Sequence, residues 1–64
     1  MNEKEFRKLA EKEIKKAVLS GGKPRIITCR DCGHTMPVYK IELGGVRYEC
    51  GVCLYCDYFY KKEL

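Results

Sequence analysis

The chain has 64 residues, with 13 lysines and arginines against nine aspartates and glutamates, and a formal net charge of +4. A chain of this length forms one domain at most and buries only about 60% of its unfolded surface, so it needs a staple beyond its apolar core. No apolar run approaches the roughly 20 residues that span a membrane, and the N-terminus lacks the apolar segment of a secretory signal. We therefore expect a cytoplasmic protein without a membrane partner.

Residues 1–20 are predicted to form an amphipathic helix. Asn2 is a suitable N-cap, and Glu5 three residues later completes a capping-box pattern. Apolar residues recur at helical spacing along one side of this helix: Phe6, Leu9, Ala10, Ile14, Ala17 and Val18. Because a helix of this length is marginal alone in water, the stripe needs a partner surface. Two partner surfaces remain open: the rest of the chain, or a second copy of the helix in a homodimer.

Lysines occupy a contiguous arc on the opposite side of the helix, namely Lys4, Lys8, Lys12, Lys15 and Lys16. One interpretation is a solvated face, which such charge runs usually form. The other is a surface that contacts nucleic-acid phosphates. The candidate contacts are Lys8, Lys12, Lys15 and Lys16 on the helix, together with Arg25 and Arg30. Stabilising i,i+4 ion pairs are expected for Glu3–Arg7 and Glu11–Lys15.

Residues 21–24 are predicted to be a hinge, because Gly21 or Gly22 can adopt the left-handed C′ conformation and Pro24 prevents the helix from continuing. Residues 25–64 then form the metal-binding module. Residues 25–28 are rich in β-branched side chains and predict a short strand, and residues 35–43 alternate as a longer one. Pro37 places the start of that longer strand at an edge or a bulge. Residues 58–62 are aromatic and then basic, and could form a further strand.

Gly44-Gly45 is typical of a two-residue hairpin turn. Folding about it predicts five cross-strand pairs: Leu43 with Val46, Glu42 with Arg47, Ile41 with Tyr48, Lys40 with Glu49, and Tyr39 with Cys50. Opposite charges then meet on one face and apolar residues on the other, which favours this register.

All five cysteines lie between Cys29 and Cys56. Two Cys-x-x-Cys pairs about twenty residues apart are a strong metal signature, because each two-residue gap lets a tight turn point both sulfurs at one ion. Four thiolates in a tetrahedron suit one Zn²⁺, and the loaded chain would then carry a charge of about +2. Disulfides are the alternative, but the odd cysteine count and the reducing compartment expected here argue against them.

Three cysteines compete for two places in the second pair. Cys50 with Cys53 is one choice, since Cys50 runs directly out of a strand. Cys53 with Cys56 is favoured, because the hairpin register puts Met36 opposite Cys53 and so brings both turns to the same end. Asp57 also tolerates the left-handed backbone that follows such a turn. The predicted ligands are therefore Cys29, Cys32, Cys53 and Cys56, with Cys50 as a spare thiol on the apolar face and His34 as a turn residue.

These residues resemble a zinc ribbon of the kind found in RNA polymerase subunits and transcription factors. The resemblance covers residues 25–62 and rests on Cys29-Arg30-Asp31-Cys32-Gly33-His34, the Gly-Gly hairpin and Cys53-Leu54-Tyr55-Cys56-Asp57. It implies a three-stranded antiparallel sheet with two zinc knuckles, and binding to nucleic acid or the transcription machinery. The hairpin tip lacks the acidic pair of the transcript-cleavage factors, which argues against that activity.

Three function classes follow from these features. The first is a module with structural zinc that binds nucleic acid. Aromatic side chains that are exposed would stack on unpaired bases, and the candidates are Tyr39, Tyr48, Tyr55, Tyr58 and Phe59. The second is a protein-interaction adaptor without nucleic-acid contact. The third is a rubredoxin-like iron protein for electron transfer, although neither cysteine pair has the proline usual there. Enzymatic activity and a small-molecule substrate are not expected, since four cysteine ligands leave zinc no open position.

Overall fold

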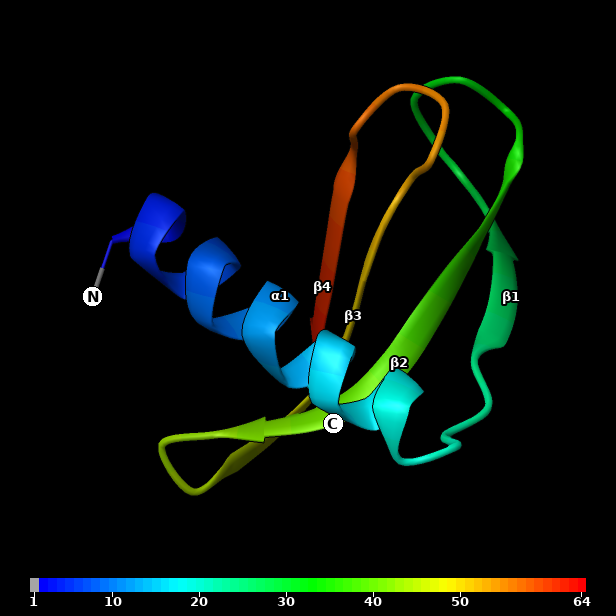
Figure 1. The fold of residues 1–64 in the computed structure, drawn as a ribbon. Helices are drawn as coiled ribbons and strands as arrows, with labels where there is room; N and C mark the ends of the chain where they lie inside the picture. The colour runs from blue at the N-terminus through cyan, green and yellow to red at the C-terminus, as the bar shows by residue number, and fades with distance from the viewer. Residues whose placement is uncertain (1) are drawn as a thin grey trace.

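The computed structural model describes residues 2–64, which form one helix followed by four strands (Figure 1). The elements are α1 (Glu3–Leu19), β1 (Arg25–Thr28), β2 (Thr35–Leu43), β3 (Val46–Val52) and β4 (Phe59–Glu63). The strands form one antiparallel sheet in the order β1-β2-β3-β4, and α1 packs against β2 and β3. The predicted α+β class is confirmed, with four strands in place of the expected three. Within residues 2–64, no helix is long and apolar enough to cross a membrane.

Both ends of α1 are fixed by local chemistry. Asn2 has an extended backbone, and its Oδ1 accepts a hydrogen bond from the backbone N–H of Glu5 at 2.9 Å. At the other end Gly21 has φ 79°, a left-handed conformation that glycine adopts without steric cost. The predicted cap and the predicted stop are therefore both confirmed.

The ion pairs on α1 differ from the predicted ones. Arg7 Nε donates to Glu11 at 2.9 Å, and Lys16 lies 3.2 Å from Glu13. Neither Glu3–Arg7 nor Glu11–Lys15 forms an ion pair in the part of the chain described, residues 2–64. The reason is tertiary: Arg7 Nη2 also donates to Asp57 at 2.7 Å, so its guanidinium is directed toward the sheet and Glu11 rather than toward Glu3.

The fourth strand arises because β2 has two partners in succession. Its first half, residues 35–38, pairs with β1, and its second half, residues 39–43, pairs with β3. β3 nevertheless passes very close to the first half of β2. A Cβ added at Gly51 would lie 2.0 Å from the carbonyl oxygen of Pro37, so this crossing requires a residue without a side chain.

The hairpin between β2 and β3 has the predicted register, from Leu43 opposite Val46 to Tyr39 opposite Cys50. Gly44 and Gly45 have φ values of 59° and 78°, as a two-residue turn of type I′ requires. Residues 58–62 were expected to form a strand, and β4 pairs there with β3, with Val52 opposite Phe59.

Two small cores lie on opposite faces of the sheet, because alternate residues of β2 point to opposite sides. The cysteine-side core consists of Cys29, Met36, Val38 and Cys53. The helix-side core consists of Ala10, Ile41 and Cys50, with Phe6 and Ile14 packed against it. The apolar stripe of α1 therefore packs on the chain's own sheet, the first of its two predicted partners. Two residues of the stripe, Leu9 and Val18, remain 39% and 50% exposed.

Candidate metal centre

Four cysteine sulfurs meet at one end of the sheet, and they are those of Cys29, Cys32, Cys53 and Cys56. All four Sγ atoms lie within 4.8 Å of one another, and the closest pairs, Cys29–Cys56 and Cys32–Cys53, are 3.5 Å apart. The thiols are free, since a disulfide needs a separation of about 2.05 Å. A tetrahedral Zn²⁺ with bonds of about 2.3 Å sets its sulfurs about 3.8 Å apart, so this group of four, the tetrad, fits one metal ion.

Two turns of the same construction supply the tetrad, and they are residues 29–34 (the first cysteine turn) and residues 53–58 (the second cysteine turn). In the first, the Gly33 N–H donates to the Cys29 carbonyl at 2.9 Å, and the Cys29 N–H donates to the His34 carbonyl at 2.7 Å. The second turn repeats both bonds with Asp57 and Tyr58, at 3.1 and 2.8 Å from their partners on Cys53.

Each turn needs a left-handed residue directly after its second cysteine. Gly33 takes this place in the first turn with φ 80°, and Asp57 takes it in the second with φ 65°. Aspartate tolerates this conformation better than most residues with a side chain. This confirms the prediction that Asp57 would accept the left-handed region, and it explains why Cys56, rather than Cys53, closes the second turn.

Backbone N–H groups also bind the sulfurs directly. Burial raises the pKa of Cys53, but hydrogen bonds from the N–H groups of Cys56 and Tyr55 outweigh it and lower the pKa to about 7. Burial and the neighbouring thiols raise the pKa of Cys56 instead. The neighbouring thiols therefore favour ionisation of Cys53 and oppose ionisation of Cys56. A divalent cation among the four sulfurs would favour the thiolate form of all of them.

Cys50 lies outside the tetrad, so the alternative pairing of Cys50 with Cys53 is not brought together with the first cysteine turn. Its side chain is fully buried in the helix-side core, and burial raises its pKa to about 11. It packs there as a small apolar side chain, as predicted. His34 is likewise a turn residue, whose backbone caps the first cysteine turn.

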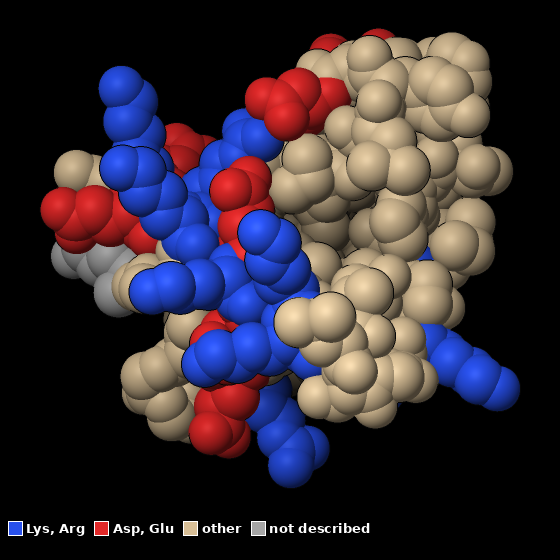
Figure 2. Space-filling view, in the orientation of Figure 1, with Lys and Arg blue, Asp and Glu red and all other residues tan. Residues whose placement is uncertain are grey.

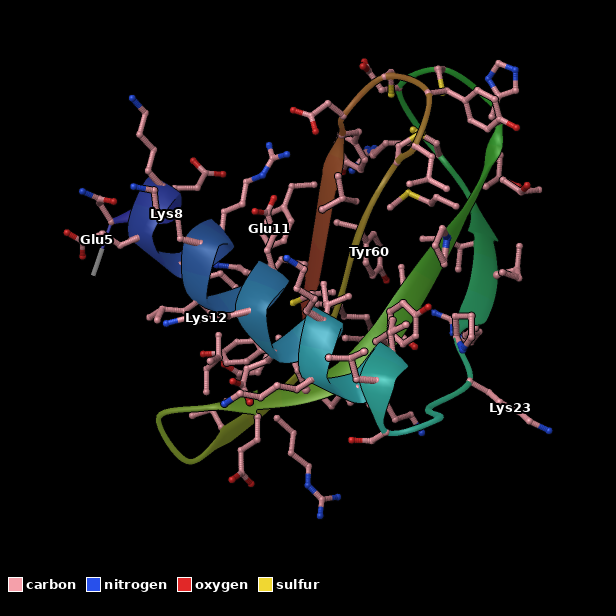
Figure 3. The ribbon with its side chains drawn as sticks, viewed as in Figure 1. Glu5, Lys8, Glu11, Lys12, Lys23 and Tyr60 are labelled. Atoms are coloured by element: carbon pink, nitrogen blue, oxygen red, sulfur yellow. The ribbon has the colours of Figure 1, made fainter. Side chains whose placement is uncertain are left out.

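The lysine arc of α1 is a separate surface. Lys8, Lys12 and Lys15 are exposed, and none of them forms an ion pair within the described residues 2–64. Figure 2 shows lysines and arginines concentrated over α1, with acidic side chains among them. Lys8 and Lys12 lie on the side of the helix away from the sheet (Figure 3). Lys16 is paired with Glu13.

The two predicted arginine contacts lie outside α1, Arg25 on β1 and Arg30 in the first cysteine turn. Arg30 is exposed in the first cysteine turn, whereas Arg25 is engaged by Glu49, which is only 4% exposed. The Arg25 Nε donates to one carboxylate oxygen of Glu49 at 2.9 Å, and Nη2 donates to the other. Glu49 lies opposite Lys40 in the β2–β3 register, as predicted. Glu49 nevertheless pairs with Arg25 and not with Lys40, because β1 places the Arg25 guanidinium where it can donate to both carboxylate oxygens.

Most of the predicted stacking aromatics are engaged in the cores. Tyr58 packs on the cysteine-side core, and Tyr39, Tyr48 and Phe59 pack on the helix-side core. Only Tyr55, at 68%, is largely exposed among those five. Its ring stacks on His34 with centroids 4.1 Å apart and planes 17° from parallel, a contact that the sequence did not predict.

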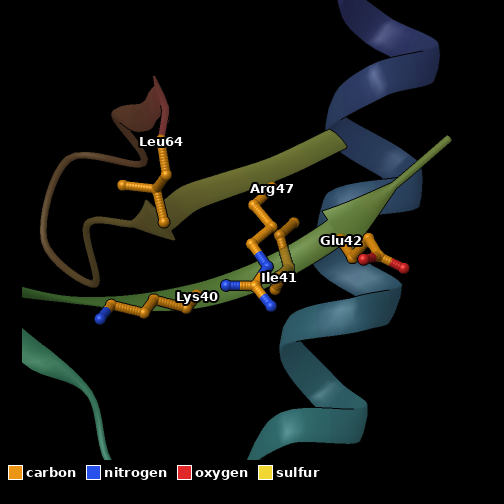
Figure 4. A pocket seen from close by; sticks show the side chains of 5 residues that line it. All are labelled: Lys40, Ile41, Glu42, Arg47 and Leu64. Atoms are coloured by element: carbon orange, nitrogen blue, oxygen red, sulfur yellow. The ribbon is translucent and has the colours of Figure 1, made fainter. Parts of the chain in front are cut away.

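A hollow of about 610 Å³ lies away from the tetrad, beside the β2–β3 hairpin (Figure 4). Its lining mixes Lys40 and Arg47 with Glu42, Ile41 and Leu64. None of these five lining residues is a cysteine or a histidine, and none carries a hydroxyl group.

Comparison with known proteins adds no relative, since no protein-family model, curated protein or solved structure matches this chain.

Proposed function

We propose that the chain is a small module that binds one structural Zn²⁺ through Cys29, Cys32, Cys53 and Cys56. The tetrad carries this proposal, because four thiol groups at the spacing of a tetrahedron are the donor set that zinc prefers in structural sites. Iron in a rubredoxin-like site would use the same donors, and metal analysis separates the two. When bound, the ion supplies a cross-link between the two cysteine turns.

Such a site is structural rather than catalytic. Four cysteine ligands complete the coordination of zinc and leave no position for water or substrate. Two of the four thiols, those of Cys29 and Cys53, lie in the cysteine-side core, and Cys32 and Cys56 pack against it, so the ion would replace the larger apolar core that this chain lacks. The free thiols this requires fit the reducing environment of the cytoplasm.

We further propose that the exposed lysines of α1 bind nucleic-acid phosphates. Lys8, Lys12 and Lys15 are the core of this surface, since they are exposed and free of ion pairs within residues 2–64. The opposite side of the helix packs on the sheet. The lysine arc therefore faces away from the sheet. The resemblance to polymerase and transcription-factor ribbons makes the transcription machinery the setting to test first.

The test is binding of a fluorescent oligonucleotide, single-stranded or duplex, to the zinc-loaded protein. Three phosphate contacts predict that affinity falls roughly 20- to 40-fold between 50 and 200 mM salt. Replacing Lys8, Lys12 and Lys15 by glutamine should abolish most of this binding and flatten the salt dependence. A control with Lys23, Arg47 and Lys62 changed to glutamine removes the same charge from positions outside α1 and should retain binding. Equal losses in both variants would contradict a specific lysine surface.

A further inference from the structure

The two cysteine turns match in backbone but differ in what they expose. Arg30 and Asp31 stand between the cysteines of the first turn, where Leu54 and Tyr55 stand in the second. Leu54 is 83% exposed and Tyr55 68% exposed. The first turn forms the same backbone hydrogen bonds with two charged residues in these places, so the fold does not require apolar ones. The apolar pair therefore needs an explanation outside the fold.

The exposed tyrosine is also held in place. His34 belongs to the first cysteine turn and Tyr55 to the second, and their stacked rings join the two turns at the surface. A ring fixed in this way loses little rotamer freedom when a partner covers it, which is what favours rigid aromatic residues in binding surfaces. We refer to Leu54, Tyr55 and His34, with Arg30 and Asp31 beside them, as the tip patch.

Charge decides what kind of partner fits the tip patch. With Zn²⁺ bound, four thiolates leave a formal charge of about −2 at the tetrad. Asp31 and Asp57 add negative charge next to it, and Arg30 and Arg7 offset those two carboxylates only. A phosphate backbone would be repelled from this end of the molecule, so nucleic acid belongs on the lysine arc and not here.

A second copy of the chain is also a poor fit. Self-association through this patch would bring two negatively charged tetrads together. Five side chains on two tight turns also offer far less than the roughly 800 Å² per partner of a stable interface. The surface is suited instead to anchoring part of a larger contact.

We infer that the tip patch docks on a basic amphipathic segment of a second protein, whose apolar side chains cover Leu54 and Tyr55 while its lysines or arginines face the negative tetrad. This inference rests on the zinc binding proposed above. It would make the chain a bridge between a protein at the tip patch and nucleic acid on α1, two surfaces of opposite charge.

The test is a titration of the full-length, ¹⁵N-labelled, zinc-loaded chain with two matched peptides, followed by NMR. The first is a helical peptide of about 18 residues with leucines on one face and lysines elsewhere, and the second carries glutamate in place of each lysine. The lysine peptide should shift the signals of residues 30–34 and 53–57. Leu54→Ser with Tyr55→Ser should weaken its binding at least tenfold, and Leu19→Ser with Leu64→Ser, which removes two other exposed leucines, should not.

Native mass spectrometry of each variant shows whether the metal is retained, so a folding defect is recognised independently of binding. Tip shifts with the lysine peptide alone support the inference. No shift at the tip, equal shifts with both peptides, or dimerisation through the tip would overturn it. If the wild-type chain holds no zinc, the proposed function fails with it. If the chain holds zinc and binds oligonucleotides while the tip signals stay unchanged, only this inference fails.

Discussion

Cys50 and Cys53 are three residues apart in the chain, yet they belong to the two different cores. Cys50 lies beneath α1 among apolar side chains, and burial raises its pKa to about 11. Cys53 is as well buried, but backbone N–H groups donate to its sulfur, and its pKa falls to about 7 despite that burial. The same side chain serves as packing in one core and as a candidate metal ligand in the other. Burial dominates at Cys50, whereas hydrogen bonds from the cysteine turn outweigh burial at Cys53.

The two cores are also covered by different elements. The helix-side core is covered by an amphipathic helix and is stabilised by apolar burial. The cysteine-side core has no helix over it, and two turns and the short β1 enclose it. We expect the stability of the helix-side core to depend on apolar packing, and that of the cysteine-side core to depend on a bound metal ion.

Metal removal should have the largest effect. A strong chelator should abolish cooperative thermal unfolding and most of the β-sheet circular dichroism signal, because zinc binding contributes about 10–16 kcal/mol to folding in zinc-finger peptides at neutral pH. Differential scanning calorimetry with and without chelator measures this. A chelated protein that keeps a cooperative transition would show that packing alone holds the fold.

The helix-side core should respond to loss of packing instead. Phe6 contacts the ring of Tyr48 edge to face, with centroids 4.9 Å apart. The Lys61 ammonium also lies 4.5 Å from the centroid of the Phe6 ring. Phe6→Ala should lower the free energy of unfolding by about 2–3 kcal/mol while zinc stays bound. Leu9→Ala on the same predicted stripe is the control, and it should cost less than about 1 kcal/mol because Leu9 is partly exposed. Equal costs would mean that α1 is not docked as described.

The Arg25–Glu49 pair, which ties β1 to β3, should give a smaller and asymmetric effect. Arg25→Gln leaves a buried carboxylate without its partner, so it should destabilise more than Glu49→Gln, and the double variant should lose less than the sum. Denaturant unfolding of the four proteins in the presence of zinc measures this coupling.

The pH dependence of that pair has a definite sign. The Arg25 guanidinium holds the pKa of Glu49 below its usual value, so the coupling is fully present above the ordinary glutamate pKa of about 4.3. It is lost only as pH falls through the lowered value of the folded state. Between about pH 5.5 and 8 the coupling should therefore stay constant, and a decline across that window would contradict an ionised pair.

The link between the two regions should matter least. Arg7 of α1 donates to Asp57, directly after Cys56, but the Asp57 side chain is 78% exposed. Arg7→Gln should reduce stability by about 0.5 kcal/mol or less at low salt, and the difference should shrink as salt rises. A loss above about 2 kcal/mol would show that the metal end and the helix are coupled far more strongly.

Local patterns predicted much of this molecule. The register about Gly44-Gly45 predicted which cysteines meet, because its extension would set Met36 opposite Cys53. In the structure the β2–β3 pairing ends at Tyr39–Cys50 and Met36 pairs with Ile27 of β1, but the two cysteine turns still meet at one end of the sheet. Asn2 caps α1 with its own side chain, and Gly21 and Asp57 act through their left-handed backbones. These three roles are local, so residue type and position in the chain were enough to predict them.

The contacts that could not be predicted join residues far apart in the chain. Arg25 reaches Glu49 only because β1 pairs with the first half of β2, and Arg7 reaches Asp57 only because α1 docks with that face inward. The stack of His34 on Tyr55 likewise depends on how closely the two cysteine turns approach. Spacing along the chain carries no signal for any of these.

Native mass spectrometry with elemental analysis, on wild type, Cys50→Ser and Cys53→Ser, tests the central claim most directly. The account predicts one zinc in wild type, one zinc retained in Cys50→Ser, and loss or marked weakening of zinc binding in Cys53→Ser. Zinc lost in Cys50→Ser but kept in Cys53→Ser, or iron in place of zinc, would contradict the division of the cysteines between a metal site and an apolar core.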